Sequence, residues 1–202
     1  MTPETSPTRR QRICVFSGSS SGVSEAYRHA ARALGKQLAH SGTDLVYGGA
    51  AVGLMGALAD AVLAEGGHVT GVIPQALVEK EIAHRGLTEL HVVTSMHERK
   101  ALMADLSDGF VALPGGIGTF EELFEVWTWA QLGNHSKPCG LLNILGFYDR
   151  LLDFLDHVAH QGFLKTVHRD MLLVEDEPEH LIRAMVRYRA PADTKWIKSA
   201  AR

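Results

Sequence analysis

Short apolar runs typical of strands alternate with longer segments of helical periodicity along most of this chain. The apolar runs predict strands over residues 13–17, 44–47, 69–73, 90–93, 109–113, 139–143 and 171–174. The intervening segments predict helices over residues 24–41, 53–66, 95–107, 119–132, 147–161 and 177–189. Such alternation favours strands that run in parallel, because each helix carries the chain back to the same edge. It therefore predicts an α/β fold with a parallel sheet of about seven strands and helices on both faces.

The length and the two ends of the chain indicate a single domain. A chain of 202 residues is long enough to bury a core of its own. We expect one domain over residues 13–189, preceded by a polar, proline-containing tail at 1–12 that is predicted to be disordered. The polar residues 190–202 are predicted to form a peripheral C-terminal tail.

Charge and cysteine content exclude several classes of protein. The formal net charge of -3 argues against a nucleic-acid binder, which usually carries a basic excess. Cys14 and Cys139 are too few for a disulfide framework and lie in apolar runs, so we interpret them as buried free thiols. No stretch is long and apolar enough to cross a membrane, and no export signal follows Arg9 and Arg10. We expect a cytoplasmic protein that binds neither nucleic acid nor membrane.

Four loops that follow predicted strands are candidates for a binding site. In open parallel sheets, ligands bind beyond the carboxyl ends of the strands. Three of the four loops are rich in glycine or in small hydroxyl residues, and all four should lie at one edge of the sheet. Together they predict a nucleotide or phosphate site, and they read SGSSSG (17–22), YGGAAVGLMG (47–56), IPQALVEKE (73–81) and LPGGIGTFEE (113–122).

The last of these loops has two interpretations. Gly115, Gly116 and Gly118 would let the backbone approach an anion at a helix N-terminus, and Thr119 would add a hydroxyl. Alternatively, Thr119 is the N-cap of the helix, and the two glutamates that follow merely suit its first turn. Spacing leaves both open. The loop matches neither the dinucleotide-binding pattern G-x-G-x-x-G nor the ATP-binding pattern G-x-x-x-x-G-K-[ST].

Two acids beside an anion cradle would repel phosphate unless a cation balances them. Arg99 and Lys100, in the predicted helix 95–107, are candidates, because the guanidinium group matches phosphate geometry. The alternative is a solvated charged helix face, since spacing alone does not place them near Glu122. No H-E-x-x-H pattern and no cluster of cysteine and histidine with ligand spacing occurs, so we expect no metal.

The predicted helix 119–132 is apolar almost all round, which is typical of a helix buried on most sides. We therefore expect part of it to meet a second subunit and the protein to be a homodimer. The alternative is that the C-terminal segment covers it. Its apolar residues are Phe120, Leu123, Phe124, Val126, Trp127, Trp129, Ala130 and Leu132.

The segment PGGIGTFEE matches the P-G-G-x-G-T-x-x-E signature of the Lonely Guy family, the cytokinin riboside 5′-monophosphate phosphoribohydrolases. The segments VFSGSSSG, YGGAAVGLMG, MHERKALM and EVWTWAQLGNHSKPCGLLN also resemble the family's, in the same order, so that the resemblance covers about residues 13–175. It implies a Rossmann-like α/β domain that dimerises. It also implies hydrolysis of the N-glycosidic bond of a nucleoside 5′-monophosphate to free base and ribose 5-phosphate, without a cofactor.

The resemblance also implies which residues form the site. Arg99 and Glu122 match the family's catalytic arginine and glutamate. Glu122 would stabilise the cation-like sugar and orient or deprotonate the attacking water, and Arg99 would anchor the substrate. Glu125 shares a helix face with two of the implied contacts. The substrate-binding positions are Glu81, Arg99, Lys100, Gly115, Gly116, Ile117, Gly118, Thr119, Phe120, Glu121, Glu122 and Thr128.

Several alternatives accompany this resemblance. Many relatives carry a lysine decarboxylase label, but pyridoxal-phosphate decarboxylation needs a Schiff-base lysine within a larger cofactor fold. The fold type also resembles molybdenum-cofactor carrier proteins, which bind a phosphorylated pterin without chemistry. An AMP nucleosidase without a hormone role is a variant of the hydrolase hypothesis. Ile117 stands where many plant members carry an aromatic residue, which leaves the preferred base open.

Overall fold

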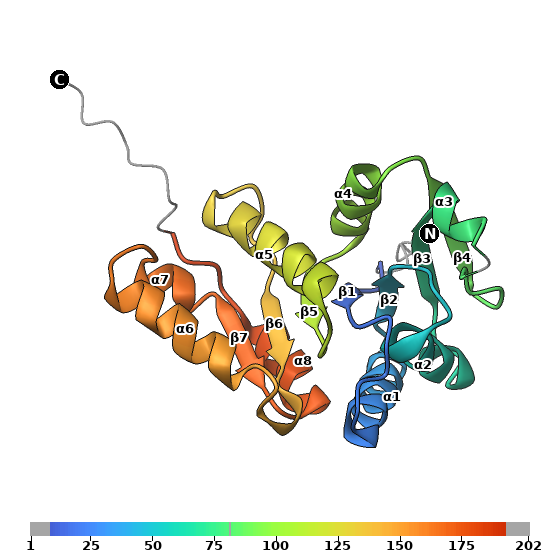
Figure 1. Cartoon of the computed structure of the whole chain (residues 1–202), viewed down its shortest axis with the longest axis horizontal. Helices are drawn as coiled ribbons and strands as arrows, with labels where there is room; N and C mark the ends of the chain where they lie inside the picture. The colour runs from blue at the N-terminus through green and yellow to red at the C-terminus, as the bar shows by residue number, and fades with distance from the viewer. Residues whose placement is uncertain (1–8, 81, 193–202) are drawn as a thin grey trace, which may run out of the picture.

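The computed structural model describes residues 9–80 and 82–192. Within these residues, seven strands form one sheet in the order β4-β3-β2-β1-β5-β6-β7, and every neighbouring pair is parallel (Figure 1). The predicted parallel α/β sheet is thus confirmed. The strands are β1 (Arg12–Phe16), β2 (Asp44–Tyr47), β3 (Val69–Pro74), β4 (Glu89–Val93), β5 (Gly109–Ala112), β6 (Cys139–Leu142) and β7 (Leu172–Glu175).

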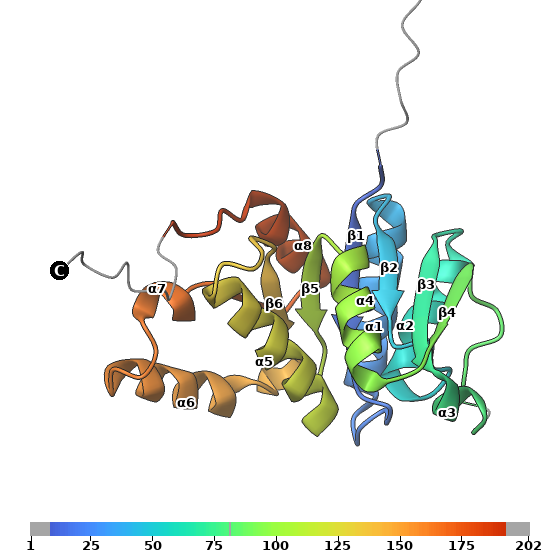
Figure 2. The same cartoon turned by 90° about the horizontal axis from the view of Figure 1, so that it is seen from above.

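Helices cover both faces of the sheet, as Figures 1 and 2 show. One face carries α1 (Glu25–His40), α2 (Gly53–Ala64) and α8 (Pro178–Arg187). The opposite face carries α4 (Met96–Leu106), α5 (Ile117–Gln131) and α6 (Asp149–His160). Three short elements complete the chain: α3 (Gln75–Val78), the 3-10 turn η1 (Ile144–Gly146) and α7 (Thr166–Arg169). None of the described helices is both long and apolar enough to cross a bilayer.

The two helical layers enclose two cores, and β1 contributes to both. Cys14 and Phe16 point into the core beneath α4 and α5, whereas Ile13 and Val15 point into the core beneath α1 and α2. Successive side chains of a strand face opposite sides, so a strand covered on both sides must be apolar throughout. Fully burying one such side chain contributes about 1.5–3 kcal/mol. The central strands are therefore a fixed frame for the loops at their ends.

The observed elements lie close to the predicted ones, with one correction at α5. This helix begins at Ile117, and its N-cap is Gly116. The interpretation of Thr119 as the N-cap is therefore wrong, because Thr119 already lies inside the first turn. The short elements α3, α7 and η1 were not predicted, since one helical turn is too short to show a period. Gly42 and Gly66, which follow α1 and α2, have φ of 67° and 72°, which favours glycine after a helix.

The chain ends extend beyond the described part. Arg12, inside the predicted tail, belongs to β1, and its backbone N–H donates to Asp108 over 2.9 Å. Residues 1–8 of the predicted tail lie outside the described residues, as do residues 193–202 of the C-terminal tail. The domain limits 13–189 remain a proposal.

The order of the strands reverses at β1, which lies between β2 and β5. The chain leaves β1 toward α1 on one face and leaves β5 toward α5 on the other, so the two loops diverge and open a crevice. Backbone hydrogen bonds continue past the strand ends: Leu113 N–H donates to Phe16 over 2.9 Å, and Gly18 N–H donates to Pro114 over 3.1 Å. This crevice is where a ligand of such a sheet is expected to bind.

Candidate active site

A cavity of about 460 Å³ lies at the carboxyl edge of the sheet, between the loops after β1, β2, β3 and β5 and the start of α4. All four loops that were singled out in the sequence contribute to it. The convergence predicted from the strand–helix alternation is thus confirmed. The lining residues are Ser17, Gly18, Ser19, Gly48, Ala50, Val52, Met55, Leu77, Ile82, Met96, Arg99, Gly116, Ile117, Gly118, Thr119, Glu121 and Glu122.

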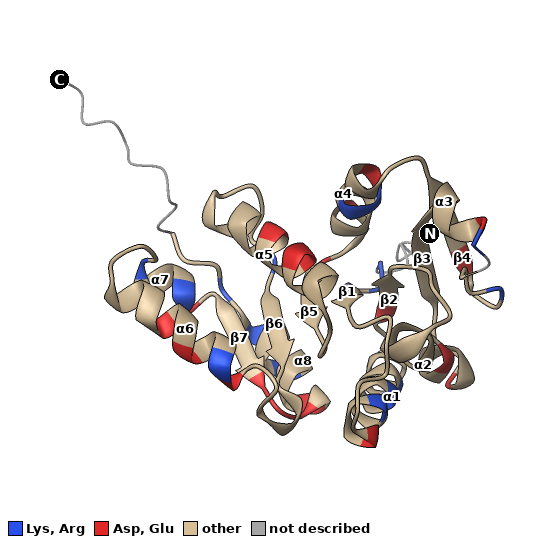
Figure 3. Ribbon diagram, viewed as in Figure 1, with Lys and Arg blue, Asp and Glu red and all other residues tan. Residues whose placement is uncertain are grey.

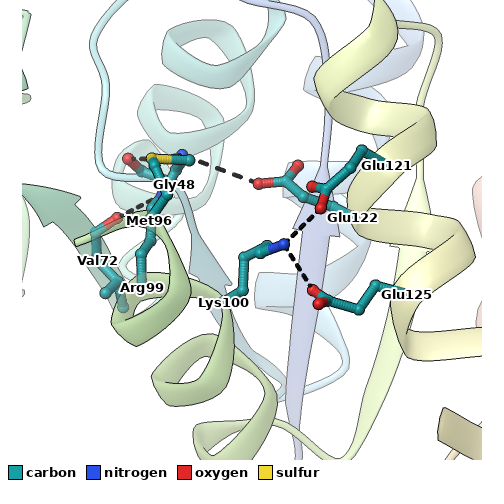
Figure 4. A network of polar contacts seen from close by, with 8 residues as sticks. All are labelled: Gly48, Val72, Met96, Arg99, Lys100, Glu121, Glu122 and Glu125. Atoms are coloured by element: carbon teal, nitrogen blue, oxygen red, sulfur yellow. Dashed lines mark hydrogen bonds and ion pairs between the residues drawn. The ribbon is translucent and has the colours of Figure 1, made fainter.

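Arg99 enters the cavity from the first turns of α4. Ser95 caps this helix, and its Oγ accepts a hydrogen bond from Glu98 N–H over 3.1 Å. The Arg99 side chain is buried, with Nε donating to the Val72 carbonyl over 3.1 Å and Nη2 donating to the Gly48 carbonyl over 3.3 Å (Figure 4). These two carbonyls belong to β3 and to the loop after β2. They fix the guanidinium group before any ligand arrives.

Glu122 approaches Arg99 from α5. Arg99 Nη1 lies 3.9 Å from Glu122 Oε1, and both side chains are almost fully covered. The pKa of Glu122 is raised to about 7, chiefly by burial, because a carboxylate loses hydration away from water. The Arg99 charge opposes this rise, and the neighbouring Glu121 adds to it. The carboxyl group therefore exchanges its proton near neutral pH, as a general acid or base requires.

Lys100 occupies a different position from Arg99. Its Nζ hydrogen-bonds to Glu121 Oε1 and lies 3.0 Å from Glu125 Oε2, as Figure 4 shows. Hydrogen bonding to Glu121 is the largest cause that raises the pKa of Lys100 above its ordinary value. Figure 3 shows acidic positions on α5 and basic positions on α4, the helices that flank the site. Arg99 and Lys100 thus supply the cations that the adjacent glutamates require, although Lys100 does not line the cavity.

The N-terminus of α5 faces the cavity with open backbone groups. Gly116 caps the helix without a side-chain bond, so the N–H groups of its first turn have no helical partner. A Cβ added at Gly116 or Gly118 would meet nothing within 4 Å, so space remains in front of both. A Cβ at Gly115 would instead overlap Thr119 Oγ1. The loop therefore combines a packed glycine with two glycines that leave room for a ligand.

The remaining predicted site residues differ in how they relate to the cavity. Ile117, at 88% exposure, lies at the rim of the cavity. Phe120 does not line the cavity but packs edge-on against Tyr148, with ring centroids 6.1 Å apart. Thr128 is exposed farther along α5. Glu81 lies outside the described residues.

The sequence did not single out the individual residues of the loops after β1 and β2. Ser17 and Gly48 follow their strands directly and both line the cavity. Gly48 has no room for a side chain, because a Cβ there would overlap Arg99 Nη2. A glycine directly after a buried strand could have marked Gly48 as a site residue. The sequence could not have shown that Arg99 occupies the space beside it.

One group of side chains among the described residues could share a metal ion: Glu175, Asp176 and His180, at the junction of β7 and α8. Two of the three are exposed, and none lines the cavity. Exposed acidic groups of this kind are common without an ion. The geometry of the cavity itself is that of an anion cradle beside a carboxyl–guanidinium pair.

The sequence is similar to known proteins over most of its length. A family profile described as "Possible lysine decarboxylase" matches residues 55–185. A probable cytokinin riboside 5′-monophosphate phosphoribohydrolase of Oryza sativa subsp. japonica is 51% identical over 181 residues, which cover 90% of this chain and 80% of that protein. A cytokinin riboside 5′-monophosphate phosphoribohydrolase of Arabidopsis thaliana is 47% identical over 190 residues, covering 94% and 88%. The chain belongs to the Lonely Guy family.

Solved structures similar to this Lonely Guy family member support its Rossmann-like fold. A molybdenum cofactor carrier protein of Chlamydomonas reinhardtii superposes with a TM-score of 0.68 at 22% identity, over 89% of this chain and 97% of that one. A molybdenum cofactor binding protein of Rippkaea orientalis gives a TM-score of 0.66 at 21% identity, over 89% and 97%. At such low identity the likeness establishes the fold alone.

Proposed function

We propose that this chain hydrolyses the N-glycosidic bond of nucleoside 5′-monophosphates, namely cytokinin riboside 5′-monophosphates, AMP or both. The products are free base and ribose 5-phosphate. The observation that carries the proposal is the buried pair of Arg99 and Glu122 beside the open N-terminus of α5. The relatives that are 51% and 47% identical to this chain are named phosphoribohydrolases, and the matched residues cover 80% and 88% of their lengths. This similarity supports the same activity here.

The 5′-phosphate lies at the N-terminus of α5 in this proposal. Backbone N–H groups and the positive end of the helix dipole favour an anion there. Gly116 and Gly118 leave the space that a phosphate needs, and Thr119 adds its hydroxyl. Glu122 lies about one helical turn beyond this end of α5. Binding the phosphate at the helix end therefore positions the ribose against Glu122.

The chemical step is the attack of water on C1′ of the ribose while the bond from C1′ to the base nitrogen breaks. Positive charge develops on the sugar, as in other glycoside cleavages. Glu122 in its carboxylate form stabilises that charge and takes a proton from the attacking water. The electrons of the broken bond go to the base, which takes up a proton as it leaves. Arg99, held by the carbonyls of Val72 and Gly48, anchors the substrate beside Glu122.

A pyridoxal-phosphate decarboxylase is a poor match to this site. A lysine that forms a Schiff base must be readily deprotonated, which requires a lowered pKa. Lys100 has the opposite environment, because Glu121 and Glu125 stabilise its charge. Among the described residues that line the cavity, none is a lysine. A carrier of a phosphorylated pterin would use the cradle but would gain nothing from Glu122 beside the anion.

We also propose a homodimer in the cytoplasm. Phe154 on α6 and Phe163 in the turn after it are 60% and 86% exposed, and a contact with a second subunit would bury them. Cys14 and Cys139 are both free and buried, which suits a reducing compartment. Sedimentation of the wild type beside Phe163→Asp tests the dimer, since a charge at a contact should dissociate it. Identical masses for both proteins would remove Phe163 from the contact.

The experiment that tests the function is base release from AMP and from isopentenyl-AMP, followed by chromatography. We expect release by the wild type and a loss of about 10²–10⁴-fold in Glu122→Gln, the range typical of a general base. The ratio of the two rates identifies the preferred base. Binding of the nucleotides without release would reject the hydrolase and favour a carrier.

A further inference from the structure

Ser17 is the first residue after β1, at the point where the strand order reverses. The residue is 8% exposed, and its Oγ has no hydrogen-bond partner among the described protein groups. Of the buried side-chain N and O atoms that lack a partner in the described part of the chain, this hydroxyl alone belongs to a residue lining the cavity. A buried polar group without a partner costs free energy, so its presence calls for an explanation.

The loop that carries Ser17 lies directly against the proposed phosphate cradle. Gly18 N–H donates to the Pro114 carbonyl over 3.1 Å, and a Cβ at Gly18 would lie 3.3 Å from the Gly115 Cα. A Cβ at Gly115 would in turn overlap Thr119 Oγ1. Ser17 and Thr119 therefore belong to adjoining segments on the two sides of the crevice, and both residues line the cavity.

The position of Ser17 is fixed by backbone contacts. Leu54 N–H donates to the Gly18 carbonyl over 3.0 Å, which ties the loop to the first turn of α2. Gly53, with φ of 59°, lets this turn approach Ser19 so closely that any side chain would overlap it. The loop therefore needs no rearrangement for Ser17 to act. Rotation about its single side-chain torsion changes the direction of the hydroxyl.

We propose that the Ser17 hydroxyl is a further substrate-binding group, which donates a hydrogen bond to the phosphoryl group of the nucleotide. The inference deepens the proposed function and rests on it for the identity of the ligand. A phosphoryl oxygen is a charged acceptor, and such an acceptor strengthens a hydrogen bond from a neutral donor. Ser17 Oγ thus has no partner among the described protein groups, and the substrate would supply one.

The chain supplies a matched control for this hydroxyl. Ser107 is also a buried serine, but its Oγ already donates to the Met103 carbonyl over 2.7 Å, and it does not line the cavity. Removing a satisfied hydroxyl leaves its acceptor unpaired and destabilises the fold. Removing an unsatisfied hydroxyl leaves no acceptor unpaired. Ser107→Ala should therefore lower stability without affecting ligand binding, whereas Ser17→Ala should weaken ligand binding without lowering stability.

The test compares wild type, Ser17→Ala and Ser107→Ala by calorimetric titration with inorganic phosphate and with ribose 5-phosphate, and by thermal unfolding without ligand. For Ser17→Ala we expect about tenfold weaker binding of both ligands, the low end for a hydrogen bond to a charged group, with an unchanged or higher Tm. For Ser107→Ala we expect a lower Tm and unchanged binding.

Equal affinities of Ser17→Ala and wild type would overturn the proposal. Weaker binding of ribose 5-phosphate alone would place the hydroxyl on the sugar and would overturn its assignment to the phosphoryl group. A Tm of Ser17→Ala as low as that of Ser107→Ala would show that the hydroxyl has a partner in the free protein. None of these titrations needs turnover, so failure of the hydrolase proposal would leave them interpretable.

Discussion

Arg99 Nη1 lies 3.9 Å from Glu122 Oε1, across the space between α4 and α5. The distance is longer than a direct hydrogen bond. The guanidinium group is held by two carbonyls behind it rather than by the carboxylate, so Glu122 is not locked into a close ion pair. The pair is therefore arranged for a substrate to approach both groups, and its properties lead to the following predictions.

The first prediction concerns the dependence of activity on pH. If Glu122 acts as a base, kcat/KM should rise as pH increases through about 7, where this carboxyl ionises. Arg99 holds the pKa below the value that burial alone would give, so Arg99→Met should move this rise to higher pH in addition to lowering the rate. Rates of base release between pH 5 and about pH 9 check it. A flat profile would exclude Glu122 as the titrating base.

The second prediction concerns stability. The pKa of Glu122 is raised in the folded state, so the folded chain binds more protons than the unfolded chain between pH 4.5 and about 7. The free energy of unfolding should therefore fall as pH rises through this window, because the unfolded carboxyl ionises first. Glu122→Gln should remove that part of the slope. Thermal unfolding of wild type and Glu122→Gln at several pH values measures the difference.

The third prediction separates two neighbouring glycines. Gly118→Ala introduces a Cβ into open space and removes a flexible residue from a helix, so the protein should be unchanged or more stable by up to about 1 kcal/mol. The same Cβ occupies the proposed phosphate space, and the KM for AMP should rise. Gly115→Ala overlaps Thr119 and should lower the Tm. An unaltered KM in Gly118→Ala would move the phosphate away from this helix end.

The fourth prediction concerns Gly48. A Cβ at this position would overlap Arg99 Nη2, so Gly48→Ala should displace the guanidinium group and reduce activity. The effect acts through Arg99, and a double-mutant cycle reveals this coupling. In an Arg99→Ala background, Gly48→Ala should therefore cost little further activity. Additive losses in the double variant would instead show that Gly48 contributes independently.

The fifth prediction concerns Lys100, which the resemblance places among the substrate contacts. The structure pairs it with Glu121 and Glu125, and its charge lowers the pKa of Glu122. Lys100→Met should therefore move the rise of kcat/KM to higher pH, and Lys100→Arg should largely restore the wild-type profile. A raised KM with an unshifted profile would indicate direct contact of Lys100 with the substrate instead.

The sequence alone predicted the sheet and the location of the site. Strand and helix periodicities are local, and seven strands were found near their predicted positions within residues 9–80 and 82–192. Parallel connections bring the loops after the strands to one edge, so the convergence of SGSSSG, YGGAAVGLMG and PGGIGTFEE followed without coordinates. The signature around Glu122 identified the family from the sequence alone, because its glycines and acids are neighbours in the chain.

Only the tertiary structure decided which side chains meet. The spacing of Arg99 and Lys100 left their partners open, whereas the packing of α4 and α5 directs Arg99 toward Glu122 and Lys100 toward Glu121 and Glu125. The pKa of Glu122 rises from 4.5 to about 7 chiefly through burial, and burial depends on atoms from many parts of the chain. Local periodicity thus determined the elements and the edge at which they converge. Desolvation and charge pairing, which act between distant residues, determined the chemistry at that edge.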